Sequence, residues 1–246
     1  MGRIFAAVLG ATLASAATAQ QAPLRADAAV VAEPTVRIQH PGGAVRVTGW
    51  DRDSIAAVLI GSAPDMAVRT VGDRESRRLI ASGDGVALEV RVPSGTRLWV
   101  KGEAGDIEVS GVSGPLELAT AHGRIRVDGA PRQVSAETMD GNIEIAATSP
   151  LTRVRTANGT IVLRSVTGDV SATSVTGPIN AGGNPVTRGR FETVSGDISF
   201  KGRPARDGVL EFVSHSGAIE LRLPPDVSAE FDVSGVRTGY VNELAP

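Results

Sequence analysis

Three histidines are the first side chains of this 246-residue chain that could do chemistry, because imidazole serves both as a metal ligand and as an acid–base group. They are His40, His122 and His215. His122 stands one residue before a glycine and His215 two residues before one, so a repeated structure would not stack them together. The sequence has no H-E-x-x-H, phosphate-loop, dinucleotide-binding or G-x-S-x-G motif. We therefore predict no catalytic, cofactor-binding or metal-binding residues and no cofactor.

A first column of polar residues directly follows a series of repeated glycines. It reads Asp106, Arg124, Asn142, Thr160, Pro178, Asp197 and Ala218. Calcium-binding solenoids stack aspartates in such a column, because Ca²⁺ requires several oxygen ligands. Here two consecutive members never both carry a carboxylate. The column does not predict a calcium site.

A second polar column has the residue types of a polysaccharide lyase or hydrolase. It reads Glu108, Arg126, Glu144, Val162, Asn180, Ser199 and Glu220. Carboxylates near one another are what glycoside hydrolysis requires. Alternating charges on adjacent strands also stabilise a sheet without any catalysis. Aromatic platforms for sugars are few, since Trp50, Trp99 and Tyr240 are the only such residues besides phenylalanine. A carbohydrate-active β-helix enzyme is therefore the alternative hypothesis.

A repeat of about 18 residues must position these side chains. Seven glycines each precede an isoleucine by two positions, at intervals of 18, 18, 18, 18, 19 and 21 residues. The isoleucines are Ile107, Ile125, Ile143, Ile161, Ile179, Ile198 and Ile219. A second apolar column lies two residues further on, at Val109, Val127, Ile145, Leu163, Ala181, Phe200 and Leu221. Three residues before each glycine after the first stands a hydroxyl residue: Thr120, Thr138, Thr156, Ser174, Thr193 or Ser214.

The period and the alternation predict an all-β fold. Alternating apolar and polar residues are typical of a half-buried strand, and glycine permits the positive φ of a sharp corner. One 18-residue unit cannot bury its own apolar side chains, whereas stacked copies can. We therefore predict a single-stranded β-solenoid of about 18-residue coils, in preference to a meander or sandwich, in which equivalent residues would not stack.

The solenoid is expected to form one domain. We predict a signal peptide at 1–19, a disordered linker at 20–32 and a solenoid domain at 33–246. Within that domain we expect an N-terminal β region at 33–101, regular coils at 102–223 and a C-terminal coil or cap at 224–246. Segments 182–189 and 202–208 are expected to protrude as corner loops. The stretch "DRESRRLI" reads equally well as a short helix or an exposed turn.

The N-terminus predicts export. Arg3 precedes a short apolar run, and Ala17-Thr18-Ala19 forms an A-x-A cleavage site, so we expect cleavage after Ala19. The apolar run is too short to span a bilayer, and we expect no transmembrane segment after cleavage. We expect the mature protein in the periplasm or outside a bacterial cell. The formal charge of −2 and the lack of a basic run argue against a nucleic-acid partner.

Two longer stretches resemble a known family. They are "VRIQHPGGAVRVTGWDRDSIAAVLI" and "LEVRVPSGTRLWVKGEAGDIEVSGVSGPLELATAHGRIRV". Their G-x-V-x-V-x-G-W-D, V-P-x-G-x-x-L and repeated T/S-x-x-G-x-I-x-V elements are similar to those of the bacterial "putative adhesin" or toastrack family, over roughly residues 35–235. The resemblance implies a β-solenoid of the cell envelope with an adhesion or envelope-stress role. It brings no catalytic residues.

Together, the repeat and the resemblance predict an exported, non-enzymatic binding or scaffolding module. Its partner would be an envelope or surface component, either protein or glycan. The sequence identifies neither the ligand-binding residues nor the oligomeric state.

Overall fold

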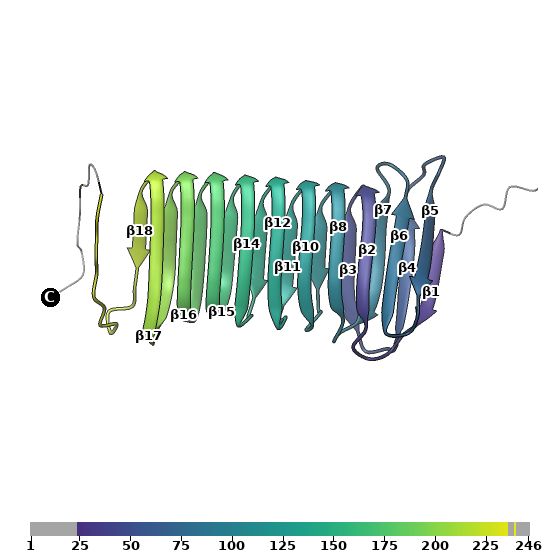
Figure 1. Cartoon of the computed structure of the whole chain (residues 1–246), viewed down its shortest axis with the longest axis horizontal. Helices are drawn as coiled ribbons and strands as arrows, with labels where there is room; N and C mark the ends of the chain where they lie inside the picture. The colour runs from purple at the N-terminus through teal and green to yellow at the C-terminus, as the bar shows by residue number, and fades with distance from the viewer. Residues whose placement is uncertain (1–23, 236–238, 240–246) are drawn as a thin grey trace, which may run out of the picture.

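The chain winds into an elongated stack of coils (Figure 1). The computed structural model describes residues 24–235 and Gly239. The predicted cleavage site, the start of the linker and Tyr240 lie outside these residues. All regular structure in 24–235 is strand, and no helix there is long and apolar enough to cross a membrane. The strands form one 18-stranded, mostly parallel sheet, which confirms the predicted β-solenoid.

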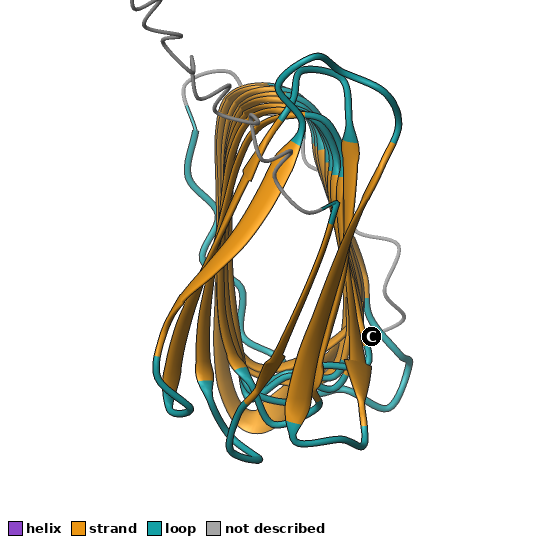
Figure 2. Ribbon diagram, turned by 90° about the vertical axis from the view of Figure 1, so that its right-hand side faces the viewer, coloured by secondary structure: helices purple, strands orange, loops and turns teal. Residues whose placement is uncertain are grey.

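Each regular coil runs over two opposing walls, either as one strand on each wall or as one long strand that continues from one wall to the other (Figure 2). Because equivalent strands of successive coils pair in parallel, residues one coil apart lie side by side. The strands of the regular coils are β8 (Arg97–Ala104), β9 (Ile107–Ser110), β10 (Pro115–His122), β11 (Ile125–Gly129), β12 (Gln133–Asp140), β13 (Ile143–Ala147), β14 (Leu151–Asn158), β15 (Ile161–Thr176), β16 (Ile179–Ser195), β17 (Ile198–Ser216) and β18 (Ile219–Arg222).

The isoleucine column is the central ladder of the core. Ile125 pairs with Ile107 on one side and with Ile143 on the other, and the pairing continues coil by coil to Ile219. Ile107 to Ile198 are at most 1% exposed, whereas Ile219 in the last coil is 44% exposed. The hydroxyl residues also pair in register, from Thr120 to Ser214. Both predicted ladders are therefore confirmed.

The N-terminal strands close one end of the stack. They are β1 (Arg25–Ala29), β2 (Thr35–Gly42), β3 (Val45–Trp50), β4 (Ser54–Ile60), β5 (Ala67–Gly72), β6 (Ser76–Ser82) and β7 (Ala87–Pro93). Strands β2 and β3 form a coil that lies between the β6–β7 coil and the β8–β9 coil. Stacking order thus differs from chain order here. Strands β1, β4 and β5 are antiparallel to their neighbours, and β1 and β5 form the outer edges.

The two walls are named after the strands of that inserted coil. The β2 wall consists of β5, β6, β2, β8, β10, β12, β14 and the second halves of β15, β16 and β17. The β3 wall consists of β1, β4, β7, β3, β9, β11, β13, the first halves of β15, β16 and β17, and β18.

Part of the expected disordered linker is ordered. Residues 25–29 form β1, which pairs with β4, and Val30 is fully buried. The small alternating residues of β1 give only a weak strand signal in sequence. Pairing with β4 supplies the hydrogen-bond partners that this edge strand would otherwise lack. In "DRESRRLI", Asp73 starts an exposed turn and the stretch continues into β6, so the structure selects the turn and not the helix.

The two expected corner loops are also corrected. Segments 182–189 and 202–208 remain in the continuous strands β16 and β17, and Val186 of the first segment is fully buried. The one to three extra residues per coil are absorbed as register shifts in the β15–β16 and β16–β17 pairings. An added residue can therefore bend a corner without leaving the sheet.

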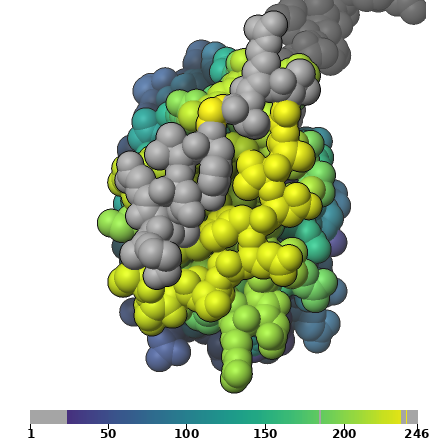
Figure 3. Space-filling model, turned by 90° about the vertical axis from the view of Figure 1, so that its left-hand side faces the viewer, coloured from purple at the N-terminus to yellow at the C-terminus, as the bar shows by residue number. Residues whose placement is uncertain are grey.

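Phenylalanines fill the core near the C-terminal end. The ring centroids of Phe191, Phe200 and Phe212 lie 5.1–5.7 Å apart. Residues 223–235, which follow β18, spread over this end of the stack without forming a strand (Figure 3). The Arg203 guanidinium holds Asp226 of this segment at 2.7 Å.

Candidate binding site

The structure does not bring the three histidines together. His40 is 1% exposed, and its Nε2 donates a hydrogen bond of 2.6 Å to the Val86 carbonyl oxygen. It aligns with Gly102 of the next coil, in line with the hydroxyl column, so its role is to tie two coils together. His122 is exposed at a corner, 3.9 Å from Asp140, and His215 is exposed elsewhere. Within residues 24–235 no group of three or more potential metal ligands occurs.

The first polar column caps backbone groups of the next coil. Oxygens of Asp106, Asn142 and Asp197 each accept a hydrogen bond of 2.8 Å from the backbone N–H of the residue one coil later. Those oxygens stabilise the corner, where the backbone leaves the sheet ladder. The acidic and amide residues are therefore explained by architecture.

The second polar column is a charge ladder that extends further than the sequence suggested. Glu108 lies 2.9 Å from Arg46, and Arg46 lies 3.0 Å from Glu89 on the far side. Arg126 contacts Glu144 at 3.5 Å. The hydrogen bond from Arg46 to Glu108 raises the pKa of its guanidinium. The sequence repeat did not indicate that Arg46 and Glu89 belong to this ladder, because their coils do not stack in chain order.

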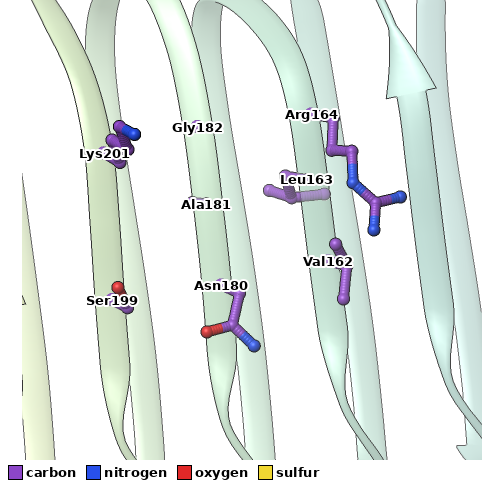
Figure 4. Close-up of a pocket in the computed structure, with 8 residues that line it drawn as sticks. All are labelled: Val162, Leu163, Arg164, Asn180, Ala181, Gly182, Ser199 and Lys201. Carbon is purple, nitrogen blue, oxygen red and sulfur yellow. The ribbon is translucent and has the colours of Figure 1, made fainter.

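A shallow depression lies on the β3 wall where β15, β16 and β17 carry small residues. Ala181 and Gly182 form its floor, and Arg164, Asn180 and Lys201 are among the side chains at its rim. Figure 4 shows the Arg164 guanidinium pointing away from Gly182. The polar groups do not converge on one point, so this depression is a poor binding site.

A deeper hollow lies over β4 at the N-terminal end of the β3 wall and is called the β4 groove. Its volume is about 580 Å³. Its lining residues are Arg25, Asp27, Ala28, Ala29, Trp50, Arg52, Ser54, Ile55, Ala56, Val58, Glu89 and Arg91.

The floor and walls of the β4 groove follow from strand register. Ala56 of β4 pairs with Asp27 of β1 on one side and with Arg91 of β7 on the other. The next row outward places Val58 between Arg25 and Glu89. Short side chains on β4 between longer ones on its neighbours thus make a trough about two strand spacings, or roughly 10 Å, across.

Trp50 stands at the Ser54 end of the β4 groove. Its indole N–H donates a hydrogen bond of 2.8 Å to the Ser54 carbonyl oxygen, which fixes the ring at the turn between β3 and β4. The guanidinium carbons of Arg52 and Arg91 lie 5.1 and 6.0 Å from the ring centroid, within cation–π range.

Two cations of the β4 groove remain without an acidic partner. Arg25 is paired with Asp27 at 2.7 Å, and Glu89 is paired with Arg46. Among the described residues Arg52 and Arg91 form no ion pair, so both are available to a ligand. The G-W-D element marked Trp50 in sequence, but only the antiparallel pairing of β4 assembles the groove.

Comparisons with known proteins agree with this fold. The family model described as Toastrack DUF4097 matches residues 29–237. The structure is similar to that of a "putative adhesin" from Bacteroides fragilis NCTC 9343, with a TM-score of 0.54 and 14% sequence identity over 81% of this chain and 96% of that chain.

A "putative cell adhesion protein" from Clostridium sporogenes ATCC 15579 matches 81% of this chain and 99% of that chain at 7% identity. Its TM-score of 0.30 is too low to support a conclusion. No curated protein matched. Because the family model spans most of the sequence, the resemblance seen in its motifs is confirmed, and this chain belongs to the toastrack family.

Proposed function

We propose that this protein is an exported, non-enzymatic binding or scaffolding module of the bacterial cell envelope, and that the β4 groove is its contact site. The observation that carries the proposal is the combination of an apolar floor, a fixed Trp50 ring and the two uncommitted guanidinium groups of Arg52 and Arg91. Concave sites with an apolar body and a few oriented polar groups are typical of ligand recognition.

The export part of the proposal rests on the N-terminal sequence. The positive residue, short apolar run and A-x-A site are those of a cleaved secretory signal. The adhesin description of the Bacteroides fragilis protein agrees with an envelope role, although a likeness of 14% identity shows the fold alone. Sequencing the N-terminus of the exported protein should find Gln20 as the first residue.

The binding part can be tested by sedimenting isolated envelope fragments with the purified protein. We expect the wild type to sediment and the double variant Arg52→Glu/Arg91→Glu to sediment in a clearly smaller fraction. Arg153→Glu/Arg155→Glu is a matched control, since it reverses two exposed arginines on β14, far from the groove. A wild type that stays in solution would refute the binding role, and normal sedimentation of the groove variant would refute the assigned site.

The alternative of a carbohydrate-active enzyme has its own test. The protein is incubated with uronate polymers and with peptidoglycan, with and without Ca²⁺, and new reducing ends are measured. Glu108 and Glu144 are both paired with arginines on a flat wall, so we expect no cleavage. Reproducible cleavage that Glu144→Gln abolishes would overturn the non-enzymatic proposal.

A further inference from the structure

We infer that the N-terminal part of the β2 wall is a second binding surface, and that its ligand is an acidic polysaccharide. This surface, the Trp99 face, lies on the wall opposite to the β4 groove. It consists of Trp99 and five surrounding cations: Arg37, Arg69, Arg78, Arg97 and Lys101. The inference rests on the proposed binding function and names a ligand class that the groove does not specify.

Strand register assembles the Trp99 face from three neighbouring strands. Arg97 and Lys101 flank Trp99 at two residues' distance on β8, so all three point outward on the same side. Arg37 of β2 is the register partner of Trp99, and its guanidinium carbon lies 5.2 Å from the ring centroid. Arg78 of β6 is in turn the register partner of Arg37.

The outer strand adds a fifth cation. Arg69 of β5 pairs with Ile80 of β6, next to Arg78, and its side chain is exposed. Trp99 is 42% exposed, whereas Phe191 and Phe200 are fully buried. The ring therefore offers free apolar surface beside the cations, with Arg37 as its register partner on one side and Glu117 on the other.

These cations are not explained by the stability of the fold. Within residues 24–235 none of the five forms an ion pair, whereas Arg46 and Arg126 on the opposite wall are paired with carboxylates. Arg37 directly opposite Arg78 is a like-charge pair, which destabilises a sheet. The exposed carboxylates nearest in register, Glu103 and Glu117, do not pair with them. An unneutralised cluster on a chain of net charge −2 points to an anionic partner.

The shape of the surface favours a linear polymer of sugar rings as the ligand. The wall is a flat sheet whose cations lie in rows across successive strands, so an extended chain can contact several of them at once. Guanidinium groups bind carboxylates in a bidentate geometry, and the exposed indole ring can stack against a sugar ring. An anionic membrane would need more inserted apolar side chains than Trp99 and Val71 provide. Export removes the protein from cytoplasmic nucleic acid.

The test uses polygalacturonate as probe and its methyl-esterified form as the uncharged counterpart. Binding is measured by calorimetry with the purified chain that begins at Gln20. We expect binding of the acid polymer that weakens with added salt, and no binding of the esterified polymer. Arg97→Glu/Lys101→Glu and, separately, Trp99→Ala should each weaken binding roughly tenfold or more, a loss of about 1.4 kcal/mol or greater.

The control variant again reverses Arg153 and Arg155, which are exposed on the same wall further along the stack. We expect its affinity to change less than about twofold, and we expect unchanged melting temperatures in all three variants because the substituted side chains are exposed. Equal losses in the control and in Arg97→Glu/Lys101→Glu would show diffuse charge attraction and overturn the assigned surface. Binding of single-stranded DNA or anionic vesicles but not of polygalacturonate would overturn the ligand class.

The two proposals fail separately. If polygalacturonate does not bind while the wild type still sediments with envelope fragments, the acidic-polysaccharide inference falls and the binding function stands. If polygalacturonate is cleaved and not merely bound, the non-enzymatic function falls.

Discussion

The Thr156 hydroxyl donates a hydrogen bond of 3.0 Å to the carbonyl oxygen of Gly141, one turn of the solenoid earlier. The same contact joins Thr138 to Gly123 at 3.3 Å and Ser214 to Gly196 at 3.1 Å. The hydroxyl column and the glycine column are therefore parts of one device. It satisfies the corner carbonyls, which the sheet ladder does not reach, and so it holds adjacent coils in register.

Thr156→Val should destabilise the protein by about 1 kcal/mol, because it keeps the shape and removes the donor to Gly141. Thr152→Val is the matched control. Thr152 is fully buried between Val134 and Val170, and its hydroxyl has no partner among the described residues. We expect this second change to be neutral or stabilising. Urea unfolding of both variants measures the difference, and equal losses would contradict the role of the Thr156 hydroxyl.

Gly141→Ala should be strongly destabilising, by about 3 kcal/mol or more. The added Cβ would overlap the carbonyl oxygen of Gly123 in the adjacent coil, and backbone atoms cannot move aside. Gly85→Ala provides the comparison, because Gly85 has a positive φ of 68° but nothing within 4 Å of an added Cβ. That change should cost only about 1 kcal/mol of backbone strain. Similar melting temperatures for the two variants would show that corner glycines are not needed for close stacking.

Ile143→Asp should lower stability by about 3–5 kcal/mol, because it leaves an unpaired charge in a fully buried position of the ladder. Glu144→Lys, at the next residue, should change stability by no more than about 1 kcal/mol, since Glu144 faces outward in a surface pair with Arg126. Thermal unfolding followed by circular dichroism checks this. The inward and outward assignments would be wrong if the two substitutions had the same effect.

Asp73 should make the β5–β6 turn sensitive to acid. Its carboxylate accepts hydrogen bonds from the backbone N–H groups of Ser76 at 2.8 Å and Glu75 at 3.0 Å. These two bonds, chiefly the one from Ser76, lower the pKa of Asp73 from its ordinary value of 3.8. A lowered folded-state pKa contributes stability above the ordinary value, and that contribution is lost as the pH falls through the folded-state pKa.

Asp73→Ala should therefore be less stable than the wild type at neutral pH, and the difference should shrink in acid. Asp73→Asn keeps an acceptor oxygen without the titration, so its stability difference from Asp73→Ala should stay constant with pH. Unfolding free energies from neutral pH down to about pH 2 measure both differences. A gap between wild type and Asp73→Ala that widens in acid would refute the role of this carboxylate.

The regular coils were predictable because each coil repeats the same pattern of glycine, isoleucine and hydroxyl residues. Gly141, Ile143 and Thr156 have counterparts one period away, and parallel pairing places equal positions side by side. The N-terminal half lacked this constraint. Neither composition nor period indicates that β2 and β3 insert between two later coils, and that β4 returns antiparallel to β7.

The candidate surfaces depend on that unpredicted half. Trp50 and Trp99 were visible in sequence as rare aromatic residues, but their partners were not. Arg91 lies near Trp50, and Arg78 lies beside Arg37 on the Trp99 face, only because strands that are distant in the chain pair with one another. A sequence repeat predicts contacts between equivalent residues, whereas these contacts join residues with no common repeat position.

Because the coils from Gly105 to Gly159 recur every 18 residues while both candidate surfaces lie at the N-terminal end, the length of this molecule is independent of its recognition chemistry. Inserting one more 18-residue coil between Gly123 and Gly141 would lengthen the stack by about 4.8 Å and leave either end unchanged. Natural variation or protein engineering could then set how far the binding end stands from an attachment point, much as spacer length sets the reach of a tether.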